Sequence, residues 1–269
     1  MPDRRAVLAA LAAAPLAACA TPSRPGDAAL LSLATFNIWH NMGDWPARLP
    51  LLVAALQAAD ADVIALQEVL EDQAVRLPNQ ARTIADALGR YEMHFVSTDA
   101  EGAPRRYGNA ILSRLPILEH ASTKLEPLDD YRTAIRVRVD FAGRAVDVVN
   151  THLAWQPDRA ATRAQQIADL MDWLPDDGTP LTVMGDFNAE QSDAGLAALT
   201  GDRFLSALPA GAAATTLHPA MGHQSRVIDH IFAETAHFTP AAAQLIGDAP
   251  SSGVHPSDHF GVAATLRLR

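Results

Sequence analysis

The 269-residue chain has one cysteine, Cys19, and only 6% aromatic residues. A single thiol cannot form an internal disulfide, so the stability of the chain must come from packing. The sequence contains no P-loop, no dinucleotide-binding glycine fingerprint and no Gly-x-Ser-x-Gly elbow, so nucleoside-triphosphate, hydride-transfer and serine-hydrolase chemistry are unsupported. It has no cysteine cluster and no His-x-x-x-His helix, and a zinc site is therefore poorly supported.

Positive charge is also scarce, with 21 lysine and arginine residues against 31 acidic residues and a formal net charge of -10. Tight non-specific binding to a polyanion depends on clustered lysine and arginine, and this composition does not favour it. A phosphate-bearing substrate stays possible, because a bound cation would be the largest local charge. Hydrophobic residues, by contrast, make up 49% of the chain, which is enough for a full core.

The N-terminal residues have the layout of an export signal. Arg4-Arg5 precedes an alanine-rich apolar run from Ala6 to Ala18, which is short for a membrane span. Leu16-Ala17-Ala18-Cys19 resembles the bacterial lipobox, in which the cysteine is lipidated. We therefore expect an exported, periplasmic lipoprotein that is anchored in the membrane through Cys19. The alternatives are a secreted soluble protein after ordinary signal cleavage, export by the twin-arginine route, and a short N-terminal helix of the fold.

Residues 1–20 are thus predicted to be a signal segment, residues 21–30 a linker with proline and glycine, and residues 31–269 one domain. Alternating or continuous apolar runs predict strands, and apolar residues at helical spacing predict helices. The loop that precedes Gly108 carries Arg105 and Arg106. The predicted strands are 30–39, 63–66, 91–97, 108–113, 131–141, 144–153, 181–184, 227–232, 238–246 and 260–268; the predicted helices are 52–59, 73–88, 157–174 and a short one near residue 196.

Polar residues recur where these apolar strands end. In the stretch from Leu181 to Asn188, a buried strand runs into Gly185 and is followed by Asp186 and Asn188, whose side chains point the same way on an extended chain. One such residue is usually a turn or cap residue. Repetition is harder to explain in this way, because strand ends on one side of a sheet converge. The set comprises Asn37, Glu68, Asn109, His152, Asp186, Asn188, Asp229, Asp258 and His259.

This set of side chains suits phosphate chemistry with a hard cation. Glu68 and Asp186 are oxygen donors of the kind that Mg²⁺ or Mn²⁺ prefers. His152 and His259 can donate to a phosphoryl oxygen or move a proton near neutral pH.

Seven motifs that carry these residues follow one another along the chain. They are Thr35-Phe36-Asn37-Ile38, Leu66-Gln67-Glu68-Val69, Tyr107-Gly108-Asn109-Ala110-Ile111-Leu112-Ser113, Asn150-Thr151-His152-Leu153, Gly185-Asp186-Phe187-Asn188, Ile228-Asp229-His230-Ile231 and Ser257-Asp258-His259. In this order they resemble the endonuclease/exonuclease/phosphatase superfamily. The resemblance spans about residues 31–269 and implies an α/β (α+β) fold: a four-layer αββα sandwich of two mixed β-sheets packed face to face, with helices on the outside.

The resemblance also implies a role for each metal-binding and catalytic residue. Glu68 would be the principal Mg²⁺ ligand, with Asn37 beside it and Asp258 next to the metal site; Mn²⁺ could replace Mg²⁺. By the same resemblance, Asp186 would activate or orient the attacking water, and Asn188 would donate a hydrogen bond to the phosphate. His259 would contact the scissile phosphate and would be oriented by Asp229. His152 would stabilise the transition state or protonate the leaving oxygen.

Three residues are candidates for substrate binding. Tyr107 matches a phosphate-contacting position of the family, and Arg132, which opens a strand beside the site, is a candidate phosphate clamp. Asn109 is a departure, because the deoxyribonuclease-like members carry a glutamate there that partners the first histidine. A neutral amide would raise the pKa of His152 less than a carboxylate, which weakens the deoxyribonuclease analogy.

The sequence therefore predicts a Mg²⁺-dependent phosphoester hydrolase of the phosphodiesterase or endonuclease kind. It would act as a monomer on nucleic acid, a lipid headgroup or a small phosphodiester. A lipid phosphohydrolase similar to sphingomyelinases or phosphoinositide phosphatases is the alternative, although Trp45 and Trp155 do not form the aromatic cluster that a sphingomyelinase needs.

Two non-enzymatic alternatives stay open. A binding protein on the same fold predicts losses among the site residues, and none is lost. A lipid- or carbohydrate-binding lipoprotein of unrelated β-sandwich fold predicts that Glu68 and His259 lie far apart.

Overall fold

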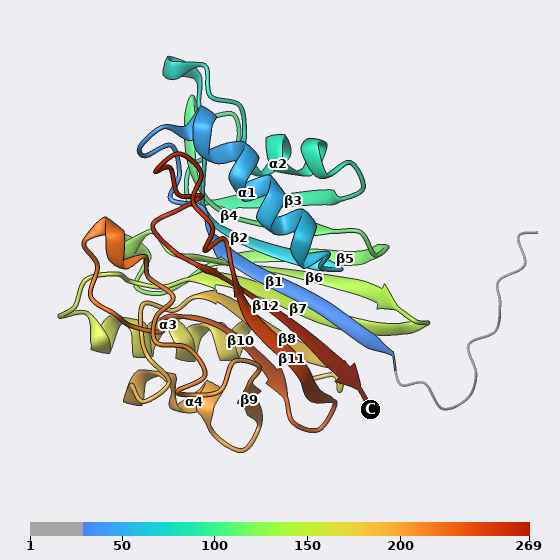
Figure 1. The fold of residues 1–269 in the computed structure, drawn as a ribbon. Helices are drawn as coiled ribbons and strands as arrows, with labels where there is room; N and C mark the ends of the chain where they lie inside the picture. Colours follow the sequence, from blue (N-terminus) through green and yellow to red (C-terminus); the bar gives the residue numbers. More distant parts are fainter. Residues whose placement is uncertain (1–28) are drawn as a thin grey trace, which may run out of the picture.

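The computed structural model describes residues 29–269. The predicted signal segment, with Cys19, and nearly all of the predicted linker lie outside the described residues. Two six-stranded β-sheets lie face to face, and helices cover the outer face of each sheet (Figure 1). The predicted four-layer αββα sandwich of two mixed sheets is confirmed.

The first sheet has the strand order β11-β12-β1-β2-β4-β3. Its neighbours β1 and β2 are parallel, and the other pairs are antiparallel. Strands covered on both faces carry apolar runs, and β1 and β2 are buried over most of their length and mostly apolar in their first halves. The six strands are β1 (Leu30–Asn37), β2 (Val63–Asp72), β3 (Glu92–Ser97), β4 (Arg105–Ser113), β11 (Phe238–Ile246) and β12 (Gly261–Leu268).

The second sheet has the strand order β5-β6-β7-β8-β10-β9, and here β7 and β8 are the parallel pair. The hairpin predicted around Gly143 joins β6 to β7; Ala142 and Gly143 both have positive φ, the geometry of a two-residue turn that follows strand twist. The six strands are β5 (Ile117–Lys124), β6 (Thr133–Phe141), β7 (Arg144–His152), β8 (Leu181–Asp186), β9 (Phe204–Ser206) and β10 (Asp229–Glu234).

Each sheet carries its own helices. Helices α1 (Trp45–Ala59) and α2 (Gln80–Leu88) pack on the first sheet through side chains such as Leu52, Leu56 and Ile84. Helices α3 (Ala160–Trp173) and α4 (Ala197–Thr200) pack on the second sheet through Ile167 and Leu170 among others. Single 3₁₀ turns occupy Gln73–Val75, Leu128–Asp130, Ala194–Leu196 and Pro219–Met221.

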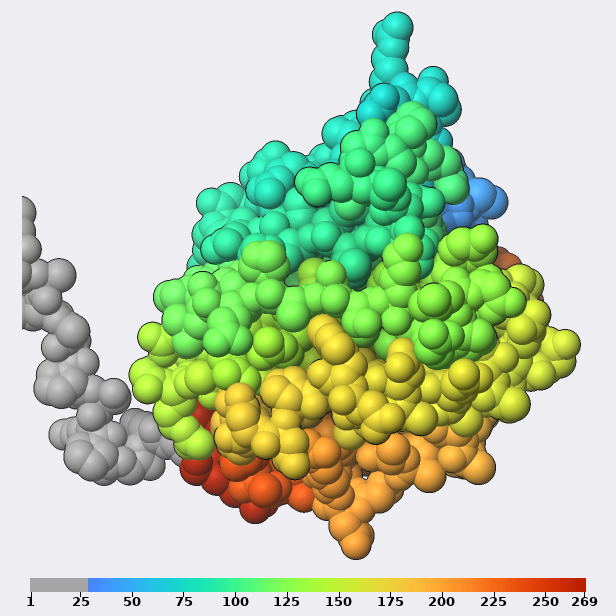
Figure 2. Space-filling model, turned by 180° about the vertical axis from the view of Figure 1, so that it is seen from behind, coloured from blue at the N-terminus to red at the C-terminus, as the bar shows by residue number. Residues whose placement is uncertain are grey.

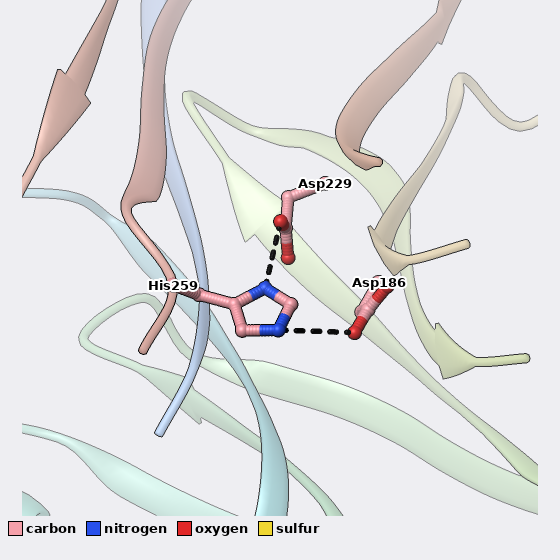
Figure 3. Close-up of side chains that lie close together, drawn as sticks. All are labelled: Asp186, Asp229 and His259. Atoms are coloured by element: carbon pink, nitrogen blue, oxygen red, sulfur yellow. Dashed lines mark hydrogen bonds and ion pairs between the residues drawn. The ribbon is translucent and has the colours of Figure 1, made fainter. Parts of the chain in front are cut away.

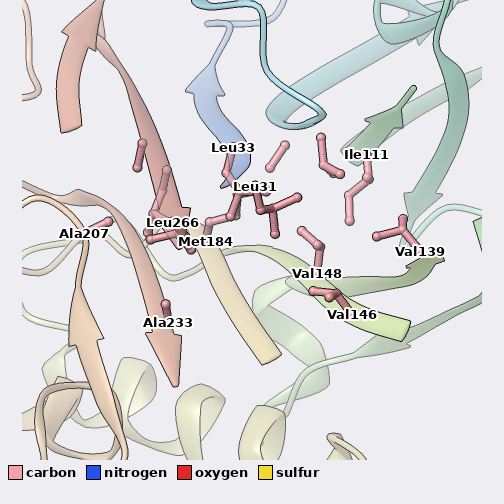
Figure 4. Close-up of a cluster of buried hydrophobic side chains, with 14 of the residues drawn as sticks. Leu31, Leu33, Ile111, Val139, Val146, Val148, Met184, Ala207, Ala233 and Leu266 are labelled. Atoms are coloured by element: carbon pink, nitrogen blue, oxygen red, sulfur yellow. The ribbon is translucent and has the colours of Figure 1, made fainter. Parts of the chain in front are cut away.

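The main core lies between the sheets (Figure 4). Leu31 and Leu33 of β1 meet Val148 of β7 and Met184 of β8, and all four side chains are buried. Burial of one such side chain contributes about 1.5–3 kcal/mol to the stability of the fold.

The surface seen from behind separates the two halves of the chain. In this view, residues of the first half of the chain, coloured cyan to green, lie above residues of the second half, coloured yellow and orange (Figure 2).

Three local predictions were wrong. Strand β2 does not end at Gln67-Glu68 but continues past a bulge to Asp72. The segment after Gln73 forms only a 3₁₀ turn, because Pro78 interrupts the helical pattern and α2 begins after it. Arg105 and Arg106 lie in β4, not in a loop, since they pair with Asp72 and Glu71 of β2. Strands β5 and β9 have no counterpart in the prediction.

Within residues 29–269, none of the helices combines the length and the apolar character needed to cross a bilayer.

Candidate active site

The polar strand ends converge at one end of the two sheets. In the parallel pair β7 and β8, His152 lies opposite Asp186, and in the antiparallel pair β8 and β10, Asp229 lies opposite Asp186. Gly185 permits this approach: its φ is +144°, and a Cβ atom there would lie 1.9 Å from the carbonyl oxygen of Thr151. Three predicted site residues are therefore brought together by strand pairing alone.

His259 lies between two buried carboxylates (Figure 3). Its Nδ1 is 2.9 Å from Oδ2 of Asp229, and its Nε2 is 3.8 Å from Oδ2 of Asp186. Burial lowers the pKa of His259, but the charge and hydrogen bond of Asp229, together with Asp186 and Asp258, outweigh burial and raise the pKa to about 10. Because Asp229 engages Nδ1, the Nε2 side of a protonated ring is presented to the site.

Asp186 is the centre of the hydrogen-bond network. Its Oδ2 accepts from Nδ2 of Asn37 at 3.0 Å and lies 3.5 Å from Nε2 of His152. Its Oδ1 accepts from the backbone N–H of Asn188 at 2.9 Å, so the strand-end turn and the site contact are made by the same side chain. Burial acts to raise the pKa of Asp186, but the neighbouring histidines and these hydrogen bonds lower it below its ordinary value.

His152 is held neutral. Burial lowers its pKa to about 3, and the positive charges of Arg132 and His259 act in the same direction. The two histidines beside Asp186 therefore differ in charge, which suits different roles in proton transfer.

Glu68 occupies the bulge of β2 with a φ of +59°. Its Oε1 accepts from Nδ2 of Asn37 at 3.2 Å, so one amide bridges Glu68 and Asp186. Burial raises the pKa of Glu68, the hydrogen bond from Asn37 opposes this, and the nearby charge of Asp258 raises it further. Carboxylates gathered in this way favour a bound cation.

Strained backbone accompanies the site. Trp39, His40, Glu68 and Asn188 all have positive φ although none is glycine. Such residues cost about 1–3 kcal/mol each and persist where surrounding contacts fix them. They cluster at functional sites in proteins, which agrees with the position of this group.

Arg48 fixes the loop that carries Trp39 and His40. The buried guanidinium donates to the carbonyl oxygens of Ile38, Trp39, His40, Met42 and Pro256. Sequence reasoning did not single out Arg48, because its partners are backbone atoms and one of them is 208 residues away.

Two buried amides join the sheets just behind the site. Nε2 of Gln67 donates to Oγ1 of Thr35 at 3.0 Å and to Oδ1 of Asn150 at 2.7 Å. Nδ2 of Asn150, on the other sheet, donates to the carbonyl oxygens of Leu66 and Ala110. These bonds fix the distance between the strand ends that carry Glu68 and His152.

The remaining predicted polar residues, Asn109, Asn188 and Asp258, each contact other groups of the protein. Nδ2 of Asn109 donates to the carbonyl oxygen and Oγ1 of Thr133, and Nδ2 of Asn188 donates to the carbonyl oxygen of Leu153, so both amides are engaged within the protein. Oδ2 of Asp258 lies 3.1 Å from Nε2 of His223.

A pocket of about 640 Å³ opens over Glu68 and His152. Tyr107 and Arg132 line it, and burial, with the charge of Glu68, raises the pKa of the Tyr107 hydroxyl. The volume falls within the range of small-molecule sites. The complete lining is His40, Glu68, Thr98, Asp99, Arg105, Tyr107, Asp130, Tyr131, Arg132, His152 and Trp155.

The donors at the site fit a hard divalent cation. Asp186, Asp229 and His259 gather within 4.8 Å of one another, and because a protonated His259 cannot ligate a metal, the two carboxylates are the ligand candidates of this group. Oδ1 of Asp229 is buried and has no hydrogen-bond partner. The predicted ligands Glu68 and Asn37 adjoin this group through the Asn37 amide. Carboxylate oxygens outnumber imidazole nitrogens, a combination that suits Mg²⁺ or Mn²⁺ better than zinc.

A family model described as Endonuclease/Exonuclease/phosphatase family matches residues 34–259. The chain belongs to this family. The resemblance drawn from the seven motifs is thereby confirmed. Together with the hydrogen bonds through Asn37 that join Glu68 to Asp186, beside His259, this excludes the alternative of an unrelated β-sandwich fold. No curated protein matches the sequence.

Solved structures share the fold. The human Nocturnin catalytic domain with bound sulfate anion is 21% identical, with a TM-score of 0.72 over 89% of this chain and 95% of that one. D. rerio TDP2 complexed with single strand DNA product is 19% identical, with a TM-score of 0.71 over 88% and 99%. A Bacteroides thetaiotaomicron mannosyl-6-phosphatase is 19% identical, with a TM-score of 0.71 over 89% and 99%.

Proposed function

We propose that this member of the endonuclease/exonuclease/phosphatase family is a divalent-metal-dependent hydrolase whose main substrates are phosphodiesters. One observation carries the proposal: buried His259 is oriented by Asp229 and faces Asp186, whose other neighbours are Asn37 and His152. This arrangement combines a fixed proton donor with a carboxylate that is held ionised, and it lies beside an open pocket.

The residues of the chain divide the reaction between them. Asp229 holds the imidazole of His259 so that its Nε2–H can donate to a phosphoryl oxygen, where negative charge develops in the transition state. Asp186 orients the attacking water and accepts its proton. The water oxygen bonds to phosphorus as the bond from phosphorus to the leaving oxygen breaks, and neutral His152 stabilises the leaving oxygen by a hydrogen bond.

Mg²⁺ or Mn²⁺, when bound, would supply positive charge to the phosphoryl oxygens. Glu68 would hold the ion with Asn37, and Asp258 adds negative charge beside them. Asp186 faces the same space and would orient the water.

The test is a hydrolysis panel of bis-p-nitrophenyl phosphate, DNA, RNA, sphingomyelin and phosphoinositides, each with Mg²⁺, Mn²⁺ or EDTA. We expect metal-dependent hydrolysis of at least one phosphodiester, abolished by EDTA. Glu68→Ala or His259→Ala should lower turnover by at least about a hundredfold, the scale of losing one such electrostatic group. Glu119→Ala, which removes an exposed carboxylate from β5, is the matched control. Near-wild-type rates in either site variant at saturating Mg²⁺ would refute the assignment.

The second candidate is a lipid phosphohydrolase. Trp155 and Tyr131 are exposed at the pocket, whereas Trp45 is buried and unavailable to a membrane. Hydrolysis confined to sphingomyelin or phosphoinositides in the panel would favour this candidate. The DNA product named for TDP2 and the sugar phosphate implied by the name mannosyl-6-phosphatase motivate nucleotide and sugar-phosphate substrates as further arms.

Export and membrane anchoring stay predictions from the sequence, because Cys19 lies outside the described residues. We expect radiolabelled palmitate to be incorporated into the full chain and not into Cys19→Ser. Equal labelling of both chains would refute the anchor, and release of a soluble protein would support signal cleavage.

A further inference from the structure

Two aromatic side chains stand exposed at the mouth of the pocket. Tyr131 is 71% exposed and Trp155 is 62% exposed, and both line the pocket that opens over Glu68 and His152. The chain has only three tyrosines and four tryptophans, and the other five are buried or half-buried. Large apolar groups left in water beside a site commonly mark a binding surface.

A single buried glutamine anchors both aromatic segments. Oε1 of Gln166, on α3, accepts from the backbone N–H of Ala154 at 2.9 Å, directly before Trp155. Nε2 of the same amide donates to Oδ2 of Asp130 at 2.7 Å, directly before Tyr131. Gln166 is fully buried, so its bond to Ala154 is shielded from water, whereas its bond to Asp130 reaches the wall of the pocket.

Further contacts fix each segment separately. Arg163, also on α3, donates to the carbonyl oxygens of Ala154 and Gln156 on either side of Trp155. Tyr131 has a φ of +55°, a conformation that is uncommon for a bulky residue. The two exposed rings are thus carried by backbone that is already fixed, which lowers the entropic cost of binding.

The charge around the pocket does not suit a long polyanion. Arg105 and Arg132 face three carboxylates of the lining: Glu68, Asp99 and Asp130. Arg105 is also paired with Asp72 at 3.6 Å. Counterion release on a nucleic-acid backbone needs a track of unpaired cations. A compact substrate with one phosphate over Glu68 and a ring at the mouth fits this lining better.

We infer that Tyr131 and Trp155 form a ring-binding subsite for the organic group of a compact phosphoester. The ligand chemistry is a ring with a flat, partly apolar face, as a nucleobase or a pyranose provides, stacked on the aromatic side chains. Gln166 is the positioning residue that holds both walls of this subsite. The inference rests on the proposed function for the phosphate end of the substrate, but the ring contact is a binding event that can be measured without turnover.

Isothermal titration calorimetry with Mg²⁺ and three phosphate monoesters tests the subsite. The probes are methyl phosphate, glucose 6-phosphate and thymidine 5′-monophosphate, which share the phosphate and differ in the ring. We expect at least one ring-bearing probe to bind about tenfold more tightly than methyl phosphate, the scale of one stacking contact. The two ring-bearing probes distinguish a sugar from a base.

Trp155→Ala and Tyr131→Ala should each remove most of this preference and leave methyl phosphate binding unchanged, whereas Trp155→Phe should keep it. Leu118→Ala is the matched control, since it removes an exposed apolar side chain that does not line the pocket. A ring preference that survives both alanine variants would overturn the subsite. So would a loss in these variants that appears only for substrates presented in phosphatidylcholine–sphingomyelin vesicles, which would assign the rings to a membrane surface.

Gln166→Glu tests the positioning role. It keeps an acceptor for Ala154 and replaces the donor to Asp130 by a like charge. We expect the ring preference to fall several-fold with methyl phosphate binding kept; an equal loss for all probes would mean that Gln166 is only structural. Should Gln166→Glu not fold, the surface variants still decide the subsite. If the unsubstituted protein hydrolyses nothing in the panel but the alanine variants lose the ring preference, the subsite is supported and the hydrolase is refuted. If the protein hydrolyses a phosphodiester but the alanine variants keep the ring preference, the hydrolase is supported and the subsite is refuted.

Discussion

The space between the two sheets has an apolar half and a polar half, and the same strand faces build both. Along β1 the inward side chains are Leu31 and Leu33 in the core, then Thr35 and Asn37 at the site. Along β7 they are Val146 and Val148, then Asn150 and His152. On the inward face of each strand, where every second side chain points, the residues change from apolar to polar towards the site.

Along each of these strands, the apolar end stabilises the fold and the polar end carries the residues of the active site. Buried polar groups lower stability unless they are hydrogen-bonded, and cross-sheet amides and ion pairs meet this condition for most of the polar half. Oδ1 of Asp229 and Oε1 of Gln67 are the exceptions within the described residues of this half. The apolar half supplies the net gain from burial. We therefore expect substitutions in the two halves to affect different measurements.

The largest expected effect lies in the apolar half. Leu33→Ala removes a buried side chain between the sheets and should lower the free energy of unfolding by about 2–5 kcal/mol. Urea unfolding followed by circular dichroism measures this, and the rate per folded molecule should change little. Leu30→Ala, an exposed position on the same strand, is the control and should be nearly neutral.

In the polar half, Asp186→Asn should lower turnover at least about a hundredfold, close to 2.7 kcal/mol of activation free energy. The amide keeps the shape and can still accept from the backbone N–H of Asn188. The unfolding free energy should thus change less than in Leu33→Ala.

Asp147→Asn is the control for this prediction, because Asp147 is equally buried but pairs with Arg136 and Arg138 away from the pocket. It should lower stability without lowering the rate per folded molecule. A similar loss of turnover in both variants would contradict the assignment of Asp186.

Asn150→Ala tests the boundary between the halves. It leaves the carbonyl oxygens of Leu66 and Ala110 without their donor, and should destabilise the fold by about 1–3 kcal/mol. A double-mutant cycle with Gln67→Ala should give a coupling energy above about 0.5 kcal/mol, as expected for hydrogen-bonded neighbours. Additive effects would mean that the two amides act independently.

The smallest expected effect is on pH dependence. The pKa of His152 is about 3 in the folded chain, below its ordinary 6.5, so acidification protonates the unfolded chain first. Its contribution to stability is complete above about pH 6.5 and is lost as the pH falls towards 3. Between pH 6.5 and 5 this loss is on the order of 2 kcal/mol. His152→Gln should flatten that part of the stability profile, measured by urea unfolding in EDTA; an unchanged slope would contradict the buried neutral state.

Much of the site could be predicted because apolar alternation and the polar residues at strand ends can be recognised in short stretches of sequence. Asp186 follows an apolar run and a glycine, and its neighbours His152 and Asp229 also stand at strand ends. Parallel and antiparallel pairing then brings the three together. The four layers were implied by the resemblance of the seven motifs to the endonuclease/exonuclease/phosphatase superfamily, and the continuous apolar strands agree with them because such strands need cover on both faces.

The parts that sequence reasoning missed depend on tertiary contacts. The bulge at Glu68 leaves no trace in an apolar pattern, because one extra residue is absorbed by positive φ. Gln166 and Arg48 each look like an ordinary helix residue, and their importance comes from backbone groups that the fold brings to them. Arg105 and Arg106 resemble loop charges until their partners across β2 are known.

The strand order also has a consequence for the time at which the site forms. Strand β1 lies between β2 and β12, and Asn37 accepts a hydrogen bond at its carbonyl oxygen from Ser257, 220 residues later. His259 and the Pro256 contact of Arg48 arrive with the same late segment. A growing chain on the ribosome therefore carries Glu68, His152 and Asp186 long before it holds a complete site, and the catalytic centre assembles only after that late segment has emerged.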